Sequence, residues 1–128
     1  MNDPETMAVI NGIGRFEPCG ESSLVDAVDL VSNAIAHCRK HGIDRLLVDV
    51  TGLSGVPVPS LVERFLMAED WAHESKGKVT VAMVASSEHI HPQKFAVKVA
   101  ERLGLVCDVY TSVPDALNWL ADGSARAG

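Results

Sequence analysis

The sequence predicts an α/β domain with the element order βαβαβαβα and a mainly parallel, four- to five-stranded sheet flanked by helices. Two observations predict it. Short, nearly continuous apolar segments rich in Val alternate with longer segments in which apolar residues recur every three or four positions. The links between these segments are short, which implies parallel neighbouring strands joined by right-handed helical crossovers. Parallel strands covered by helices are apolar on both faces, as these segments are.

The first half of the chain supplies two strands and a helix. A strand is expected at residues 7–10, and the glycines after it leave open whether the chain bends or forms a hairpin through residues 15–16. Ser22 or Ser23 is expected to cap a helix whose apolar stripe ends at Cys38 and which Gly42 terminates. A buried strand follows at residues 46–50.

A second helix is expected after the turn-rich loop at residues 51–59. Ser60 and Glu63 have the spacing of a capping box. The apolar residues predicted on the inward face of this helix are Leu61, Phe65, Ala68 and Ala72.

The last part of the chain predicts two more strands, at residues 79–85 and 106–110, each followed by a helix. The inward faces predicted for these helices are Ala96, Val99, Ala100 and Leu103 for the first and Val113, Ala116, Leu117 and Leu120 for the second. Ligands of such sheets gather at the carboxyl ends of the strands. Loops 11–21, 51–60, 86–93 and 111–113 are therefore where a site is expected.

Composition limits the function. The chain has 128 residues, which fit one domain, and we expect it at residues 6–121 with a flexible tail at 122–128. The formal charge of −6 opposes binding to nucleic acid or to an anionic membrane surface. No apolar run reaches the ~18 residues that span a bilayer. The acidic, polar start lacks a signal-peptide pattern, so a cytoplasmic location is expected.

The motifs with chemical potential are weak. Gly12 and Gly14 follow a strand, but Glu17 occupies the third glycine position of the dinucleotide fingerprint, so a structural bend is favoured. Asp49 ends a strand, as the phosphoryl-accepting aspartate of receiver domains does, but an acidic pair after the first strand is missing. His89 and His91 would need further ligands to hold a metal. The sequence thus predicts no catalytic residue, cofactor or metal.

The cysteines and aromatic residues suggest packing before chemistry. Cys38 and Cys107 lie in apolar segments and are expected to be buried thiols, whereas Cys19 lies in a loop between two glutamates that oppose thiolate formation. Phe65, Met67 and Trp71 on one helix are either core residues or a patch that contacts a partner or a ligand.

Several segments together resemble the STAS domains of sulfate transporters and anti-sigma-factor antagonists, above all the small bacterial single-domain proteins grouped as STAS/SEC14-like or SpoIIAA-like. The segments are residues 9–12, 45–52, 78–84, 95–100 and 109–120, the last of which combines an aromatic residue, a hydroxyl residue and the sequence Asp-Ala-Leu-Asn-Trp-Leu. The resemblance covers residues 6–121 and implies a SpoIIAA-like fold that acts by binding and performs no catalysis.

The same resemblance implies a phosphorylation site that this chain lacks in its usual form. In anti-sigma-factor antagonists a partner kinase phosphorylates a serine in the loop before the second helix, and the added charge disrupts docking. The corresponding position here is Val58 or Pro59. Ser54 and Ser60 are the remaining candidates for a phospho-switch.

Three functions follow as expectations. The first is a regulatory or binding domain whose partner is another protein, a second copy of the chain in a homodimer, or a small apolar or anionic ligand. The second is a switch of the anti-sigma-antagonist kind, phosphorylated at Ser54 or Ser60. The third is an enzyme with a metal or thiol site built from His89, His91 and Cys19.

Overall fold

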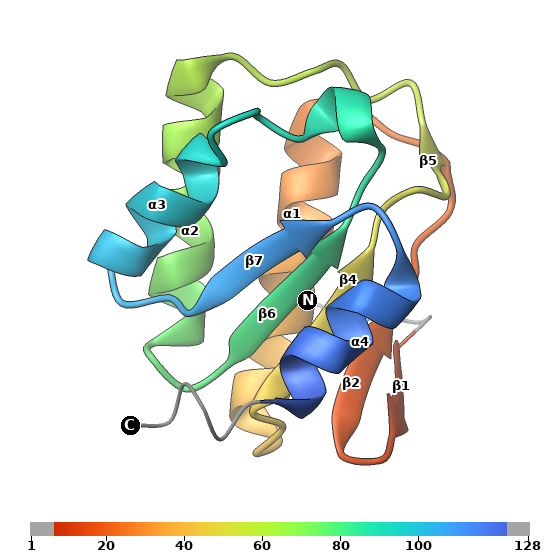
Figure 1. Ribbon diagram of the computed structural model, residues 1–128, viewed down its shortest axis with the longest axis vertical. Helices are drawn as coiled ribbons and strands as arrows, with labels where there is room; N and C mark the ends of the chain where they lie inside the picture. Colours follow the sequence, from red (N-terminus) through yellow and green to blue (C-terminus); the bar gives the residue numbers. More distant parts are fainter. Residues whose placement is uncertain (1–6, 123–128) are drawn as a thin grey trace.

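The computed structural model describes residues 7–122, and they form an α/β fold around a five-stranded sheet (Figure 1). The strand order is β1-β2-β4-β6-β7. The strands are β1 (Met7–Ile10), β2 (Ile13–Phe16), β4 (Arg45–Asp49), β6 (Thr80–Val84) and β7 (Cys107–Tyr110). β1 pairs antiparallel with β2, and every other neighbouring pair of this sheet is parallel. The α/β class and the mostly parallel sheet are confirmed; apart from Asp122, the tail expected at 122–128 lies outside the described residues.

Three helices cover one face of the sheet and one helix covers the other (Figure 1). Helices α1 (Leu24–Lys40), α2 (Leu61–Ser75) and α3 (Phe95–Arg102) share a face, and α4 (Val113–Ala121) packs on the opposite one. The strands lie in chain order, so successive right-handed crossovers place their helices on the same side. A short helical turn, η1 (Ser87–His89), follows β6, and a two-stranded sheet of β3 (Gly20–Glu21) and β5 (Leu53–Ser54) lies apart from the main sheet.

The hairpin that the sequence left open is formed by β1 and β2. Asn11 and Gly12 join the strands, with φ values of 54° and 78°. Positive φ at both central residues is the geometry of a type I′ turn, which Asn-Gly favours. Gly14 has a packing role, because a Cβ there would lie 3.1 Å from Sγ of Cys38. The two glycines thus serve a turn and a close strand–helix contact.

Each face of the sheet has its own core. The α1–α3 side buries, among others, Phe16, Ile35, Leu46, Val48 and Leu105. The α4 side buries Ile13, Leu47, Ala82, Val84, Ala116 and Leu120. Alternate residues of β4 point to opposite cores, which is why this strand is apolar over most of its length.

The inward face predicted for α2 is wrong at its first two positions. Leu61 is 53% exposed and Phe65 is 41% exposed, whereas Ala68 and Ala72 are buried as expected. The buried face is turned toward Arg64, Trp71 and Ser75 instead. The contact with α1 sets this rotation, because Nε1 of Trp71 donates to the carbonyl oxygen of Val28 at 3.2 Å and Ser32 Oγ donates to the Asp70 carboxylate at 2.6 Å.

The predicted inward position of Leu103 is also wrong. This residue is 47% exposed. α3 ends at Arg102, and Gly104 follows with a φ of 92°, so the chain leaves the helix before Leu103 can face the sheet. Leu105 takes the buried position at 1% exposure.

The capping signals are confirmed. Ser23 Oγ accepts from the backbone N–H of Asp26 at the start of α1. At the start of α2, Ser60 Oγ accepts from the N–H of Glu63 at 3.2 Å, and the Glu63 carboxylate accepts from the N–H of Ser60 at 2.8 Å. These bonds satisfy N–H groups that a helix leaves without partners in its first turn.

Replacing Ser60 with Ala is expected to lower the free energy of unfolding by about 1 kcal/mol, because the first turn of α2 loses its side-chain acceptor. Urea denaturation followed by circular dichroism measures the change. The matched control is Ser54→Ala, which alters an exposed hydroxyl and is expected to change stability by less than about 0.5 kcal/mol. Equal losses in the two variants would contradict the capping role.

Candidate functional site

A cavity of about 610 Å³ lies between the sheet and the three helices that share its face. Its lining comes from α1, α2 and α3, from β6 and β7, and from the loops that follow β4 and β6. The cavity therefore reaches the carboxyl ends of parallel strands, which is where the sequence located a site and where ligands of such sheets bind.

Two helices contribute apolar stripes to the cavity. Ala27, Val28 and Val31 line it from α1, at the spacing of residues on one helix face. Met67 and Trp71 line it from α2, four residues apart. Trp71 is 9% exposed and is held by its bond to Val28, so the wall between α1 and α2 is fixed.

The floor of the cavity is the sheet itself. Val81 and Met83 of β6 and Cys107 and Val109 of β7 line it. Within each strand these residues are two apart, so they point to the same face of the sheet. The floor therefore presents aliphatic and sulfur-containing side chains.

Two loops meet over the strand ends and are joined by His89. Its Nε2 donates to the carbonyl oxygen of Val56 at 2.8 Å, because a carbonyl only accepts. Its Nδ1 lies 2.8 Å from Ser86 Oγ. Both ring nitrogens are thus occupied in a bridge between the loop after β4 and the loop after β6.

One ion pair at the cavity is neutralised within the protein. Nζ of Lys94 lies 2.8 Å from the Asp108 carboxylate and 5.2 Å from the centre of the Tyr110 ring. Asp108 also accepts from the N–H of Val109 and from the Tyr110 hydroxyl. These bonds connect the start of α3 to β7.

Arg64 is the functional candidate that the sequence analysis did not find. Its side chain is buried at 7% exposure, lines the cavity from α2, and donates through one terminal nitrogen to the carbonyl oxygen of His89 at 3.1 Å. The capping box fixes the start of α2, and Arg64 then lies four residues before the correctly predicted Ala68 on the same helix face. This four-residue spacing from Ala68 is the feature of the sequence that could have predicted Arg64 on the buried face of α2.

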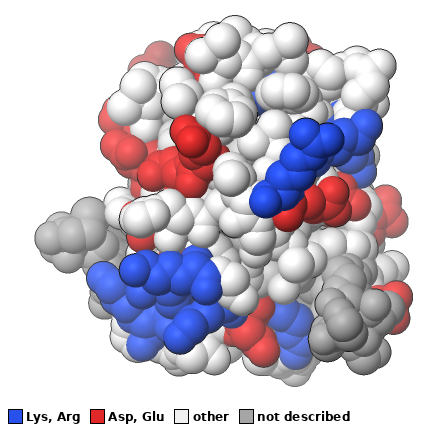
Figure 2. Space-filling view, turned by 90° about the vertical axis from the view of Figure 1, so that its left-hand side faces the viewer, with Lys and Arg blue, Asp and Glu red and all other residues white. Residues whose placement is uncertain are grey.

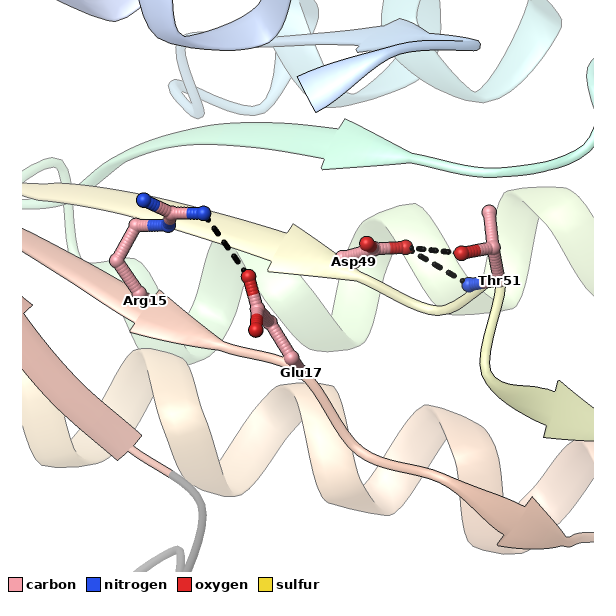
Figure 3. A network of polar contacts seen from close by, with 4 residues as sticks. All are labelled: Arg15, Glu17, Asp49 and Thr51. Carbon is pink, nitrogen blue, oxygen red and sulfur yellow. Dashed lines mark hydrogen bonds and ion pairs between the residues drawn. The ribbon is translucent and has the colours of Figure 1, made fainter. Parts of the chain in front are cut away.

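A second polar cluster lies at the ends of β2 and β4 (Figure 3). Arg15 pairs with Glu17 at 2.9 Å. The Asp49 carboxylate accepts from the Thr51 N–H at 3.0 Å and from the Thr51 hydroxyl at 2.6 Å. Asp49 therefore closes the turn after β4, a structural task for the residue that resembled a phosphoryl acceptor.

The residues of the metal or thiol hypothesis do not form a ligand cluster. No group of three or more His, Cys, Asp or Glu side chains suited to a metal ion occurs within residues 7–122. His89 is committed to its loop bridge, and Nδ1 of His91 accepts from the N–H of Gln93 at 3.1 Å. Cys19 is exposed, and it lies next to Gly52 in the turn after β4.

The predicted contact patch is divided by the fold. Met67 and Trp71 line the cavity, where a ligand would contact them, whereas Phe65 is on the outer side of α2. The outer side also exposes other apolar side chains. We call this set the outer α2 patch; its members are Leu61, Val62, Phe65 and Leu66. Figure 2 shows this side of the molecule: the top of the view is mostly uncharged, acidic groups lie at the upper left, and basic groups lie at the right and at the lower left.

The two candidate switch serines lie on either side of the loop after β4. Ser54 is exposed in β5, where its carbonyl oxygen accepts from the N–H of Ser22 at 2.9 Å. Ser60 is exposed, and its hydroxyl caps α2. Both therefore remain accessible positions near the strand ends.

Cys38 is buried as predicted, Cys107 is only partly buried on the floor of the cavity, and both are weak nucleophiles. Burial raises the pKa of the Cys38 thiol from 9.0 to about 11. Burial, and then the neighbouring charges of Asp108 and Glu101, raise the pKa of Cys107 to about 12. Since the thiolate is the reactive form, both residues are protonated near neutral pH.

At pH 8, Cys19 is expected to react with Ellman's reagent in the native protein, while Cys38 and Cys107 react only on unfolding. A pKa of about 11 lowers the thiolate fraction of Cys38 about a hundredfold relative to a thiol at 9.0. The Cys19→Ser variant is the control, and it should show almost no fast reaction. A fast reaction in that variant would contradict the raised pKa values of the other two thiols.

The comparisons with known proteins add no relative. No protein-family model matches the chain, and no curated protein matches it. The STAS resemblance thus stays a prediction from the residues. Within the described part of the chain, no helix has both the length and the apolar character to cross a bilayer.

Proposed function

We propose that this chain is a non-enzymatic, cytoplasmic binding domain of the STAS type that takes a small, largely apolar molecule into the cavity under α1, α2 and α3. The cavity is the observation that carries the proposal. Its volume of about 610 Å³ falls within the roughly 300–1,000 Å³ of small-molecule sites.

The chemistry of the walls supports an apolar ligand. Most of the lining is aliphatic, with Trp71 as the aromatic member. Apolar surface that leaves water on binding contributes about 25 cal/mol per Å². A ligand with a hydrocarbon part would therefore gain free energy along the faces of α1 and α2 and along the sheet.

The polar groups around the cavity support binding over catalysis. His89 holds two loops together, and Lys94 and Asp108 hold each other. A general acid or base must reach a substrate proton at hydrogen-bond distance. His89, Lys94 and Asp108 use their hydrogen-bonding atoms in contacts within the protein.

Addition of 10-bromodecan-1-ol is expected to quench the fluorescence of Trp71 and to leave that of Trp119 almost unchanged. Bromine quenches an indole on contact, Trp71 lines the cavity, and Trp119 packs on the α4 side of the sheet. The sequence has two tryptophans, so Trp119→Phe isolates the first signal and Trp71→Phe isolates the second.

Two controls sharpen this test. Ala96→Phe adds a ring on the cavity side of α3 and should weaken quenching by the bromoalcohol, because it occupies part of the space. Ala121→Phe, at the exposed end of α4, adds the same ring away from the cavity and should not. Equal quenching of both tryptophans, or of neither, would contradict the proposed site.

The outer α2 patch favours a second candidate function, which is self-association. Its four side chains are apolar, and a two-fold dimer would place this patch against itself. Because the chain carries a formal charge of −6, two copies repel each other over most of their surfaces, and an uncharged patch is where they approach at least cost.

If a dimer forms through this patch, light scattering coupled to size exclusion at about 1 mM protein will give twice the chain mass, and Phe65→Ser with Leu66→Ser will return the monomer. Both side chains are exposed in the single chain, so the double variant should keep its fold. A wild-type monomer at that concentration would exclude the dimer and leave the cavity proposal unaffected.

A further inference from the structure

The buried guanidinium of Arg64 has an unusual position for a cation. It lies on the face of α2 that packs toward the sheet, in the same helical stripe as Met67, Ala68 and Trp71. Only 7% of the residue is exposed. The helix therefore carries a permanent positive charge into an otherwise apolar wall of the cavity.

The protein provides few hydrogen-bond acceptors for the guanidinium of Arg64. A guanidinium has five N–H donors. Among the described residues, one of these bonds is made, to the carbonyl oxygen of His89, and no carboxylate forms an ion pair with Arg64. Within the same residues, Nε of Arg15 is the single side-chain nitrogen that is both shielded from solvent and without a hydrogen-bond partner. The nitrogens of Arg64 that form no hydrogen bond are therefore not shielded in this way, and they border open space.

The other partly buried basic side chains have partners. Arg15 pairs with Glu17, Arg39 with Glu74, and Lys94 with Asp108. Burying a charge without a counter-ion opposes folding, because the protein does not replace the lost hydration. Arg64 departs from this pattern at the place where the fold also leaves a cavity.

The carboxylates nearest the cavity do not take the role of counter-ion. Asp108 is occupied by Lys94, by the N–H of Val109 and by the Tyr110 hydroxyl. Glu88 lines the cavity but is exposed to solvent in η1. Within residues 7–122, therefore, no carboxylate completes Arg64.

We propose, building on the apolar-ligand function above, that the ligand is an amphiphilic carboxylate whose headgroup is bound by Arg64. The planar guanidinium matches a carboxylate through two parallel hydrogen bonds. The hydrocarbon part then lies against Val28, Met67 and Trp71, which belong to the same cavity. One end of the site selects charge, and the rest selects apolar surface.

Calorimetric titration of decanoate and of 1-decanol at pH 8 tests the headgroup alone, because the two probes share a ten-carbon chain and decanoate is ionised there. The wild-type protein should bind decanoate about tenfold to a hundredfold more tightly than the alcohol, the range expected for hydrogen bonds to a charged group. Arg64→Met should abolish this preference while decanol affinity changes less than about threefold.

Two further variants keep the result interpretable. Arg102→Met removes an exposed cation at the end of α3 and should preserve the preference, which separates a local headgroup site from a general effect of net charge. Arg64→Lys keeps the charge without the fork and should lower the decanoate-to-decanol ratio at least about threefold. The lysine variant decides the question if Arg64→Met does not fold.

The failures of the two proposals are distinguishable. Equal binding of decanoate and decanol by the wild type, or a preference that survives both Arg64 substitutions, would overturn the carboxylate assignment and leave an apolar site. Binding of neither probe would overturn the apolar site itself, and the carboxylate assignment with it.

Discussion

The placement of three helices on one face of the sheet is the constraint on which the cavity depends. β2, β4, β6 and β7 are parallel and lie in chain order, so α1, α2 and α3 all have to pack side by side on the same face. α1 and α2 meet through direct polar bonds between their side chains and backbone. Across from them lies the short α3, which lines the cavity with the small residues Ala96 and Ala100. The helices therefore cover the sheet without filling the space above it.

The same constraint explains why Arg64 is tolerated. On α2 the inward stripe is set by the contacts of Trp71 and Asp70 with α1, and that rotation carries Arg64 under the loops that follow β4 and β6. A tightly packed interior would exclude an unpaired guanidinium. Beside a cavity the free donors of Arg64 stay accessible to a ligand. The uncompensated charge lowers the stability of the fold, but it does so at a position where it would strengthen ligand binding.

The sequence predicts the fold well where local signals are strong. The capping box at Ser60, the cap at Ser23 and the alternation of apolar strands with periodic helices depend on neighbouring residues, and the structure confirms them. The hairpin was left open although Asn11 and Gly12 form the dipeptide that favours it. The rotation of α2 and the exposure of Leu103 depend on contacts between distant segments, which periodicity does not contain. The cavity could not be predicted from the sequence for the same reason, because it is the space that remains between segments distant in the chain.

The two faces of the sheet are built for different tasks. On the α4 side Leu47, Ala82 and Val84 pack against Ala116 and Leu120, and the polar groups at the strand ends close turns or pair with each other. On the other side His89 joins the loops that follow β4 and β6, and burial keeps the thiol of Cys107 protonated by raising its pKa to about 12. The guanidinium of Arg64 lines the cavity with unused hydrogen-bond donors and stays protonated, so it is suited to hold an anion.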